Sequence, residues 1–216
     1  MDEALLHHLP FMLEPSKLQT NPDYQSRQHF VTIGNFRHAP NWDSVLYLQQ
    51  LWPHIRKRLP QAELHIYGSY PPPKATALNN PKQGFLLKGW CDDAYEVIKS
   101  ARVLLSPLRF GAGIKGKFLD AMACEAPSLT TNIGIEGMFN EAHWPGLVAN
   151  SDESIISSAV ELYQNESLWH EKSSRCHPAI KAKFDQLTLS SELLARIELI
   201  RSQLSQHRLN NFIGAM

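Results

Sequence analysis

The sequence predicts an α/β fold, a Rossmann-like three-layer αβα domain with a mostly parallel sheet and a helical C-terminal extension. From His29 onward, strand-like and helix-like segments alternate with turn residues between them, which is typical of βαβ units. Several expected strands end at a glycine, as residues 30–33 end at Gly34. The continuous apolar run at residues 103–105 indicates a strand that is covered on both faces. A chain of 216 residues suffices for one such domain with additions but is short for two.

Strands are expected wherever a short apolar or alternating run is bounded by turn residues. They are residues 30–33, 63–67, 85–88, 103–105, 128–131 and 147–149. Loops that follow parallel strands meet at the carboxyl edge of the sheet, so the segments after the first four strands should form one crevice. We therefore expect the chemistry of the protein at that edge.

Helices are expected between the strands and in the last third of the chain. They are residues 41–59, a helix capped by Asp92 and Asp93 that runs to Ala101, residues 114–125, a helix capped by Asn150 and Ser151, and a final helix around residues 189–204. Pro40 suits the start of the first helix, Pro60 ends it, and Pro53 is expected to kink it. The final helix repeats apolar residues every three or four positions, so it is expected to be amphipathic and to need an apolar partner surface.

These elements divide the chain into three expected parts. Residues 1–28 contain a short apolar stretch followed by a polar, turn-rich segment, and they are expected to be an N-terminal linker. Residues 29–185 are expected to form the Rossmann-like domain, and residues 186–216 the C-terminal helical extension.

Composition excludes several classes of function. Lys and Arg together number 21, as do Asp and Glu, so the net charge of +0 gives no long-range attraction to nucleic acid or to an anionic membrane. No apolar run approaches the roughly 20 residues of a membrane-spanning helix. Asp2 and Glu3 stand where a secretory signal would be positively charged, so we expect a cytoplasmic location. The widely spaced Cys91, Cys124 and Cys176 predict free thiols, with no disulfide framework and no metal site.

The segment from Pro107 to Lys117 carries the clearest chemical signal. It reads P-L-R-F-G-A-G-I-K-G-K and lies between a buried strand and a helix. Gly111, Gly113 and Gly116 let the backbone turn sharply and approach a ligand without obstruction by side chains. The start of the helix offers unpaired N–H groups and a partial positive charge, and such helix starts bind phosphate.

Three cations accompany this segment. Lys115 and Lys117 are expected in the first turn of the helix, where the helix dipole disfavours cations unless an anion is bound. Arg109 adds a third positive charge. The same pattern also fits a plain glycine-rich turn with solvated lysines, so the segment alone leaves both interpretations open. It matches neither the Walker loop nor the dinucleotide-binding fingerprint, which follows the first strand.

Three stretches carry a resemblance to a known family. They read F-V-T-I-G-N-F-R-H-A-P-N at residues 30–41, G-A-G-I-K-G-K-F-L-D-A-M-A at residues 111–123 and T-T-N-I-G-I-E-G at residues 130–137. They resemble the C-terminal donor-binding domain of family-4-type (group 1) glycosyltransferases, and the likeness runs from about His29 to Tyr163. Enzymes of that family have the GT-B fold, in which the C-terminal Rossmann-like domain binds a nucleoside-diphosphate sugar and the N-terminal domain binds the acceptor.

The resemblance implies roles for the residues of the second stretch. The donor diphosphate would lie against Gly111, Ala112, Gly113, Ile114 and Lys117. Lys115, with Arg109 near it, would be catalytic and would neutralise charge that develops on the leaving group. Asp120 would face the ribose of the nucleotide. The family also implies that no divalent metal or other cofactor is required.

The sequence departs from the family pattern at several of these positions. The family usually has Glu where this chain has Asp120, and another Glu eight residues earlier, where this chain has Ala112. After the first strand the family usually presents an Arg and then a Lys, whereas this chain has Asn35 and Asn41. The paired-carboxylate contact is therefore in doubt, and Arg37 is a candidate substitute for the missing cation.

Other candidate donor contacts lie after the remaining strands. Gly34, Asn35, Arg37 and Gly68 are expected in the same crevice as the glycine-rich segment. Trp90 either stacks on the base of the nucleotide or packs half-buried against the domain. Glu136 either hydrogen-bonds donor or acceptor hydroxyls or caps its own loop.

The sequence therefore predicts a glycosyltransferase domain that binds a nucleoside-diphosphate sugar for transfer to an unknown acceptor, with the acceptor domain absent from this chain. The alternatives are a non-catalytic nucleotide-sugar-binding module and one subunit of a split transferase, which would regain activity on mixing with its partner. Self-association or a separate acceptor-domain partner is expected, because the face of the missing half would otherwise expose apolar surface. Phe11, Met12, Phe212 and Ile213 are candidates to cover it.

Overall fold

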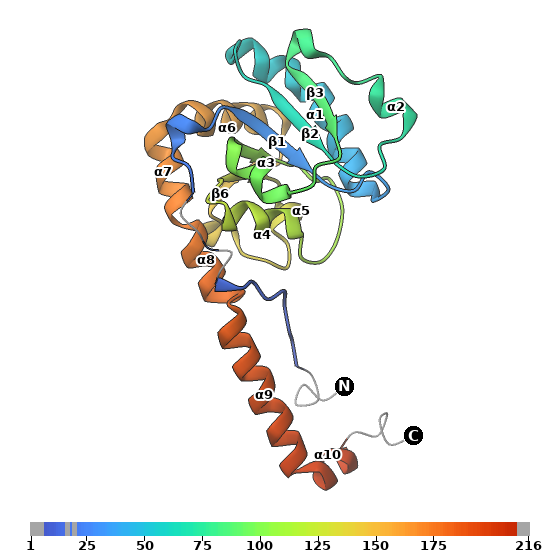
Figure 1. Cartoon of the computed structure of the whole chain (residues 1–216), viewed down its shortest axis with the longest axis vertical. Helices are drawn as coiled ribbons and strands as arrows, with labels where there is room; N and C mark the ends of the chain where they lie inside the picture. The colour runs from blue at the N-terminus through green and yellow to red at the C-terminus, as the bar shows by residue number, and fades with distance from the viewer. Residues whose placement is uncertain (1–6, 16–17, 19–20, 211–216) are drawn as a thin grey trace.

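A six-stranded parallel sheet forms the centre of the structure. Its strands are β1 (His29–Ile33), β2 (Leu64–Tyr67), β3 (Phe85–Gly89), β4 (Ala101–Leu105), β5 (Ser128–Thr130) and β6 (Gly146–Val148). In the computed structural model, which describes residues 7–15, 18 and 21–210, they lie in the order β3-β2-β1-β4-β5-β6 (Figure 1). Every strand pairing in this sheet is parallel. The expected fold class is confirmed, and the strand order is that of doubly wound nucleotide-binding domains.

Helices connect and follow these strands. The longer ones are α1 (Ala39–Arg58), α3 (Ala94–Ser100), α4 (Gly116–Ala123), α6 (Asp152–Gln164), α7 (Glu166–Ser174), α8 (Cys176–Lys183), α9 (Gln186–Ser202) and α10 (Leu204–Asn210). Short turns of helix are η3 (Tyr24–Ser26), α2 (Pro73–Thr76), η4 (Pro81–Gln83), α5 (Asn132–Ile135) and η5 (Glu141–His143). The last two lie between β5 and β6, outside the helices that the sequence predicted.

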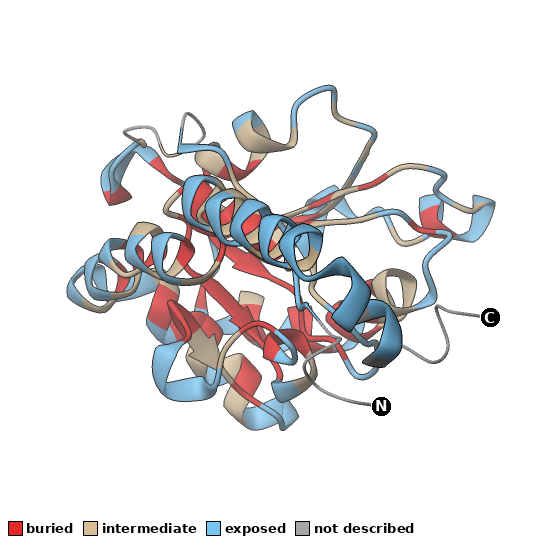
Figure 2. Cartoon of the chain, turned by 90° about the horizontal axis from the view of Figure 1, so that it is seen from below, coloured by how far each residue is buried: buried red, intermediate tan, exposed pale blue. Residues whose placement is uncertain are grey.

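Helices cover both faces of the sheet and bury a core on each side. On one face α1 and α6 pack against strand residues that include Phe30 and Leu129. On the other face α3, α4 and α8 enclose a second core that includes Val31 and Leu104. Neighbouring residues of one strand serve opposite cores because successive side chains of a strand point to opposite faces. Figure 2 shows the buried strands between helices whose outer sides are exposed.

Most helix boundaries agree with the predictions, but α4 begins later than expected. Ser151 caps α6 through a capping box, and the Asp93 carboxylate accepts hydrogen bonds from the first amides of α3. The helix expected from about residue 114 starts at Gly116, because Gly113 has the left-handed φ of 73° and Lys115 is the extended N-cap residue. Lys117 is therefore in the first helical turn, as expected, whereas Lys115 precedes that turn.

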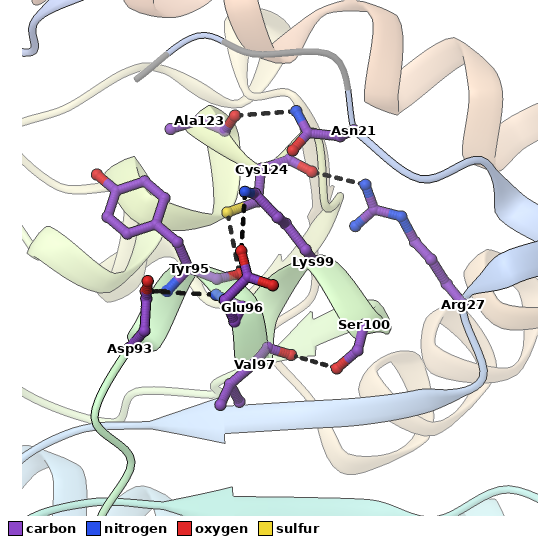
Figure 3. A network of polar contacts seen from close by, with 10 residues as sticks. All are labelled: Asn21, Arg27, Asp93, Tyr95, Glu96, Val97, Lys99, Ser100, Ala123 and Cys124. Carbon is purple, nitrogen blue, oxygen red and sulfur yellow. Dashed lines mark hydrogen bonds and ion pairs between the residues drawn. The ribbon is translucent and has the colours of Figure 1, made fainter. Parts of the chain in front are cut away.

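Residues 21–28, which the sequence grouped with an N-terminal linker, pack against the domain. Tyr24 is buried, and Arg27 has no exposed surface. The Arg27 guanidinium donates to the carbonyl oxygens of Pro22 at 2.8 Å, Ala101 at 3.2 Å and Cys124 at 2.6 Å. Figure 3 shows its approach to the end of α4. Cys124 is the C-cap residue of α4, so its carbonyl oxygen has no partner within the helix. The Arg27 guanidinium supplies that partner and places a positive charge at the end of the helix, where the dipole favours it.

Helix α9 extends away from the sheet beside the described N-terminal residues (Figure 1). It has no buried residue, and Leu187, Leu194 and Ile197 are 69%, 66% and 51% exposed. The expectation of one amphipathic helix is wrong in its geometry, because α9 ends at Ser202 and its apolar side chains are not gathered on one side. Phe212 and Ile213, expected to cover apolar surface, lie outside the described residues. Within the part of the chain that the structure describes, no helix is both long and apolar enough to cross a membrane.

Two stacked histidines at the N-terminal end of the sheet predict a pH-dependent stability. The rings of His29 and His65 are 3.8 Å apart, and His65 Nε2 lies 2.7 Å from a carboxylate oxygen of Glu63. His29 Nε2 is buried without a hydrogen-bond partner. Burial, and then the neighbouring His65 and Lys88, lower the pKa of His29 to about 4, while the Glu63 carboxylate opposes this shift. Above about pH 6.5, the ordinary pKa of histidine, neutral His29 makes its full contribution to the stability of the fold. This contribution is lost as the pH falls towards 4, the pKa of His29 in the folded protein.

We expect urea unfolding to show that the His29→Phe variant, which keeps a ring at this position, loses less stability than the wild type between about pH 7 and about pH 4.5. The difference should be up to about 3 kcal/mol, which corresponds to the lowered pKa. Equal losses in the two proteins would mean that His29 does not contribute to the acid sensitivity.

Candidate functional site

A pocket of about 370 Å³ opens at the carboxyl ends of β1 and β4. These two strands are neighbours in the sheet, and the chain leaves them in opposite directions across it. Doubly wound sheets bind ligands at such a switch point. The lining residues come from the end of β1, the start of α1, the start of α3 and the segment into α4: Ile33, Gly34, His38, Asn41, Ala94, Ala112, Ile114, Lys115, Gly116, Lys117 and Asp120.

The glycine-rich segment brings the backbone to this pocket. Gly111 and Gly113 have φ values of 132° and 73°, which L side chains rarely adopt. A Cβ atom on Gly113 or Gly116 would meet nothing within 4 Å, so the space beside them is open. The N-cap residue Lys115 makes no side-chain hydrogen bond to the helix. The first amides of α4 are therefore available to an anion in the pocket.

Lys117 extends from the first turn of α4 to the base of the pocket. Its Nζ lies 2.8 Å from Asn41 Oδ1 and 3.3 Å from Ser106 Oγ. Burial lowers its pKa from 10.5 to about 7. Both hydrogen bonds go to neutral oxygens, so an anionic ligand in the pocket would stabilise the charged form of Lys117.

Lys115 lies on the outer side of the same pocket. Its Nζ donates to the backbone carbonyl oxygen of Glu136 at 3.3 Å. Burial lowers the pKa of Lys115, and the Glu136 carboxylate opposes that shift. The structure thus brings the Lys115 ammonium group to the backbone of Glu136.

Asp120 lines the pocket one turn further along α4. Burial, and then the charge of Asp120 and a hydrogen bond to its carboxylate, raise the pKa of Tyr95 on α3. Sequence reasoning missed Tyr95 as a partner of Asp120. It also missed His38, which lines the pocket, and Ser106, which contacts Lys117, because the spacing of single polar residues does not show which neighbours they meet in the fold.

The two arginines proposed from sequence are engaged elsewhere. Arg109 donates to both carboxylate oxygens of Asp43, at 2.9 and 2.5 Å, and its guanidinium lies over the Tyr47 ring. Arg37 lies over the ring of Tyr70 at 3.9 Å. Neither arginine is among the residues that line the pocket. The charge of Arg109 is already neutralised, so the structure leaves the pocket cations to the lysines.

Three further candidates are not among the residues that line the pocket. Trp90 is 69% exposed at the end of β3, and its Nε1 donates to Asp92 at 3.1 Å, so the alternative of half-buried packing does not describe it. Asn35 accepts a hydrogen bond from the Arg37 amide through its side chain. Gly68 contacts the loop after β1 so closely that its role is to let two backbones approach.

Replacing Gly68 with Ala is expected to destabilise the protein and to distort the pocket. The added Cβ would clash with the carbonyl oxygen of Gly34, and it would lie 2.6 Å from Cε2 of Phe36. Such overpacking typically costs about 1–3 kcal/mol. Denaturant unfolding measures the effect.

Gly116→Ala provides the matched control, because a Cβ at Gly116 would meet nothing within 4 Å. This replacement should leave stability unchanged or raise it by about 0.5–1 kcal/mol, since Ala favours a helix more than Gly does. Equal stability of the two variants would show that the close approach at Gly68 is not required.

Comparison with known proteins places this chain in a family. The family model described as glycosyl transferases group 1 matches residues 27–165, which is more than half of the chain. No curated protein sequence is similar enough to count as a match.

Solved structures with a similar fold are larger than this chain. A mutant of S. aureus TarM in complex with fondaparinux, α-GlcNAc-glycerol and UDP has a TM-score of 0.68 at 16% identity, covering 83% of this chain and 37% of that one. The pneumococcal O-GlcNAc transferase GtfA, in complex with UDP and GlcNAc, has a TM-score of 0.65 at 16% identity, covering 85% and 38%. Anabaena HepE, in complex with UDP and glucose, has a TM-score of 0.64 at 9% identity, covering 87% and 55%. The chain thus spans about half, or less, of the length of these proteins.

Proposed function

The chain belongs to the group 1 glycosyl transferases, and from that premise we propose that its pocket binds a nucleoside-diphosphate sugar by the diphosphate. The observation that carries this proposal is the meeting of two lysines with the uncapped start of α4 at the switch point of the sheet. A diphosphate needs positive charge and N–H donors in one place, and this pocket supplies both.

The individual roles follow from the position of each side chain. In the proposal, the amides at the start of α4 and Lys117 hold the diphosphate, and Lys115 at the outer side stabilises the charge that develops on the leaving group. Asp120 is held by Tyr95 and accepts hydrogen bonds from ribose hydroxyls. The positive charge comes from lysines and backbone amides, without a metal.

Two peripheral contacts complete the proposed donor site. The exposed ring of Trp90 stacks on the base of the nucleotide. Glu136, whose backbone carbonyl accepts from Lys115, lies where its carboxylate can reach hydroxyls of the sugar. Both contacts remain predictions about a bound complex.

An acceptor site has to come from protein other than the described domain. The chain corresponds to the C-terminal half of the GT-B fold and covers only part of each similar structure. We propose that further residues of a longer chain, a separate acceptor-domain partner or a second copy supplies the rest of the cleft. The exposed apolar residues of α9 supply surface for such an association. The same donor site would also serve the two alternative functions, a subunit of a split transferase and a binding module without turnover.

Calorimetric titration with UDP, GDP, ADP and their sugar conjugates tests the proposed function. We expect one nucleotide series to bind, and we expect a crystal soaked with that ligand to show its diphosphate against residues 111–117. The proposal fails if no nucleotide sugar binds, or if the soaked crystal shows the pocket filled by the protein's own side chains.

A further inference from the structure

Lys117 differs from the two arginines at the carboxyl edge of the sheet in what its charged group contacts. Arg109 is paired with the carboxylate of Asp43, and Arg37 lies over an aromatic ring. The hydrogen bonds recorded for Lys117 Nζ go to an amide oxygen and a hydroxyl oxygen. An amine can make both contacts with or without its extra proton, because a neutral amine still has two N–H donors.

The surroundings of Lys117 disfavour that extra proton while the pocket holds no anion. His38, Lys115 and Asp120 line the same pocket, and Tyr67 lines a small adjoining cavity with Lys117. The Asp120 carboxylate is hydrogen-bonded to Tyr95. Burial is the cause that lowers the pKa of Lys117 to about 7. Near neutral pH the amine is therefore divided between its two protonation states.

We propose that the donor diphosphate and a proton bind together, with the proton taken up by Lys117 Nζ. This inference rests on the proposed function. The phosphates of a nucleotide sugar are diesters that stay ionised across the neutral range, so the proton comes from the buffer and ends on the amine. The ammonium then pairs with a phosphate oxygen while its other N–H groups keep Asn41 and Ser106 as acceptors.

Calorimetry in two buffers of different ionisation enthalpy measures this proton directly. The ligands are UDP-glucose, UDP-GlcNAc, GDP-mannose and ADP-glucose, whose phosphates do not titrate in the range used. With a free pKa near 7, uptake should rise from about 0.1 proton per ligand at about pH 6 to about 0.9 at about pH 8. The affinity should fall about tenfold between these two pH values.

Substitutions assign the proton to one residue. Lys117→Met should weaken binding at least tenfold at about pH 6 and abolish its proton uptake. Lys117→Arg keeps a charge that does not titrate, so it should bind without proton uptake and without the fall in affinity at higher pH. Lys115→Met should weaken binding and leave the proton uptake unchanged. Lys82→Met, which removes a charge from an exposed lysine, controls for net charge and should change neither quantity.

Each outcome supports or overturns a specific statement. Proton uptake in the wild type that disappears in both Lys117 variants supports the inference. Binding without proton uptake, or uptake that persists in Lys117→Met, overturns the inference and leaves the proposed function standing. If none of the four ligands binds the wild type, the proposed function falls and the inference falls with it.

Discussion

Replacing Arg27 with Met is expected to lower the free energy of unfolding by about 4 kcal/mol, or the melting temperature by about 10 °C. Arg27 is fully buried and donates hydrogen bonds to three carbonyl oxygens. Met fills a similar length but offers no donor, so three carbonyl oxygens lose a donor at once, and two of these contacts are buried. Each buried unsatisfied group costs about 1–3 kcal/mol.

Two comparisons make the Arg27 prediction specific. Arg27→Lys keeps the charge, but an ammonium group has fewer N–H donors than a guanidinium and does not match its planar geometry. An intermediate loss of unfolding free energy is therefore expected. Arg58→Met, at an exposed position near the end of α1, should change stability by less than about 0.5 kcal/mol. Urea unfolding measures all three variants. A loss below about 1 kcal/mol for Arg27→Met would show that water or rearranged backbone replaces its donors.

Replacing Lys115 with Ala is expected to reduce turnover about 100-fold, which corresponds to about 3 kcal/mol of lost transition-state stabilisation. Lys115 lines the outer side of the pocket, where its ammonium group can meet charge that develops as the diphosphate departs. Lys115 would meet charge that appears only in the transition state. Removing Lys115 should therefore lower kcat more than it changes KM. The measurement is release of nucleoside diphosphate from the nucleotide sugar that binds, with water or an added acceptor.

Stability provides the control for Lys115. A cation at the start of a helix is unfavourable to the dipole, so Lys115→Ala should leave the free energy of unfolding unchanged or raise it slightly. Lys115→Arg keeps the charge and should retain part of the activity. Near-normal turnover of Lys115→Ala would remove this residue from the mechanism.

These predictions concern the two ends of one helix. The carboxyl end of α4 is fixed by Arg27 through the carbonyl of Cys124, and its amino end forms the pocket with Lys115 and Lys117. Loss of Arg27 in the folded protein should therefore also weaken donor binding, because a helix released at one end holds its first amides less firmly.

Local patterns predicted most of the fold correctly. The alternation of strands and helices, the caps Asp93 and Ser151 and the apolar run of β4 depend on residues that are neighbours in the chain. Where a prediction from neighbouring residues failed, a backbone conformation or a contact with a distant part of the chain determined the structure instead. The left-handed φ of Gly113 delays α4 to Gly116, and the apolar residues of α9 are not gathered on one side as the periodicity suggested.

The candidate site also has one part that neighbouring residues predict and another part that only the folded chain determines. Glycines that follow a buried strand and precede a helix indicate a phosphate-binding segment by themselves, because backbone freedom and a helix start are local properties. The sequence offered Arg109, Lys115 and Lys117 as three cations at that segment. Only the folded chain separates them, by pairing Arg109 with Asp43 and placing Lys117 against neutral acceptors.

The sequence by itself determined an α/β domain with a parallel sheet, a glycine-rich turn after the fourth strand and a likeness to donor-binding domains of glycosyltransferases. The tertiary structure decided which cations line the pocket, that Tyr95 hydrogen-bonds Asp120, and that Arg27 is buried at the end of α4. The physical reason is the sequence separation of the partners: Lys117 meets Asn41 across 76 residues, and Arg27 meets Cys124 across 97. Such contacts are set by the packing of helices on the sheet, which no local pattern of residues contains.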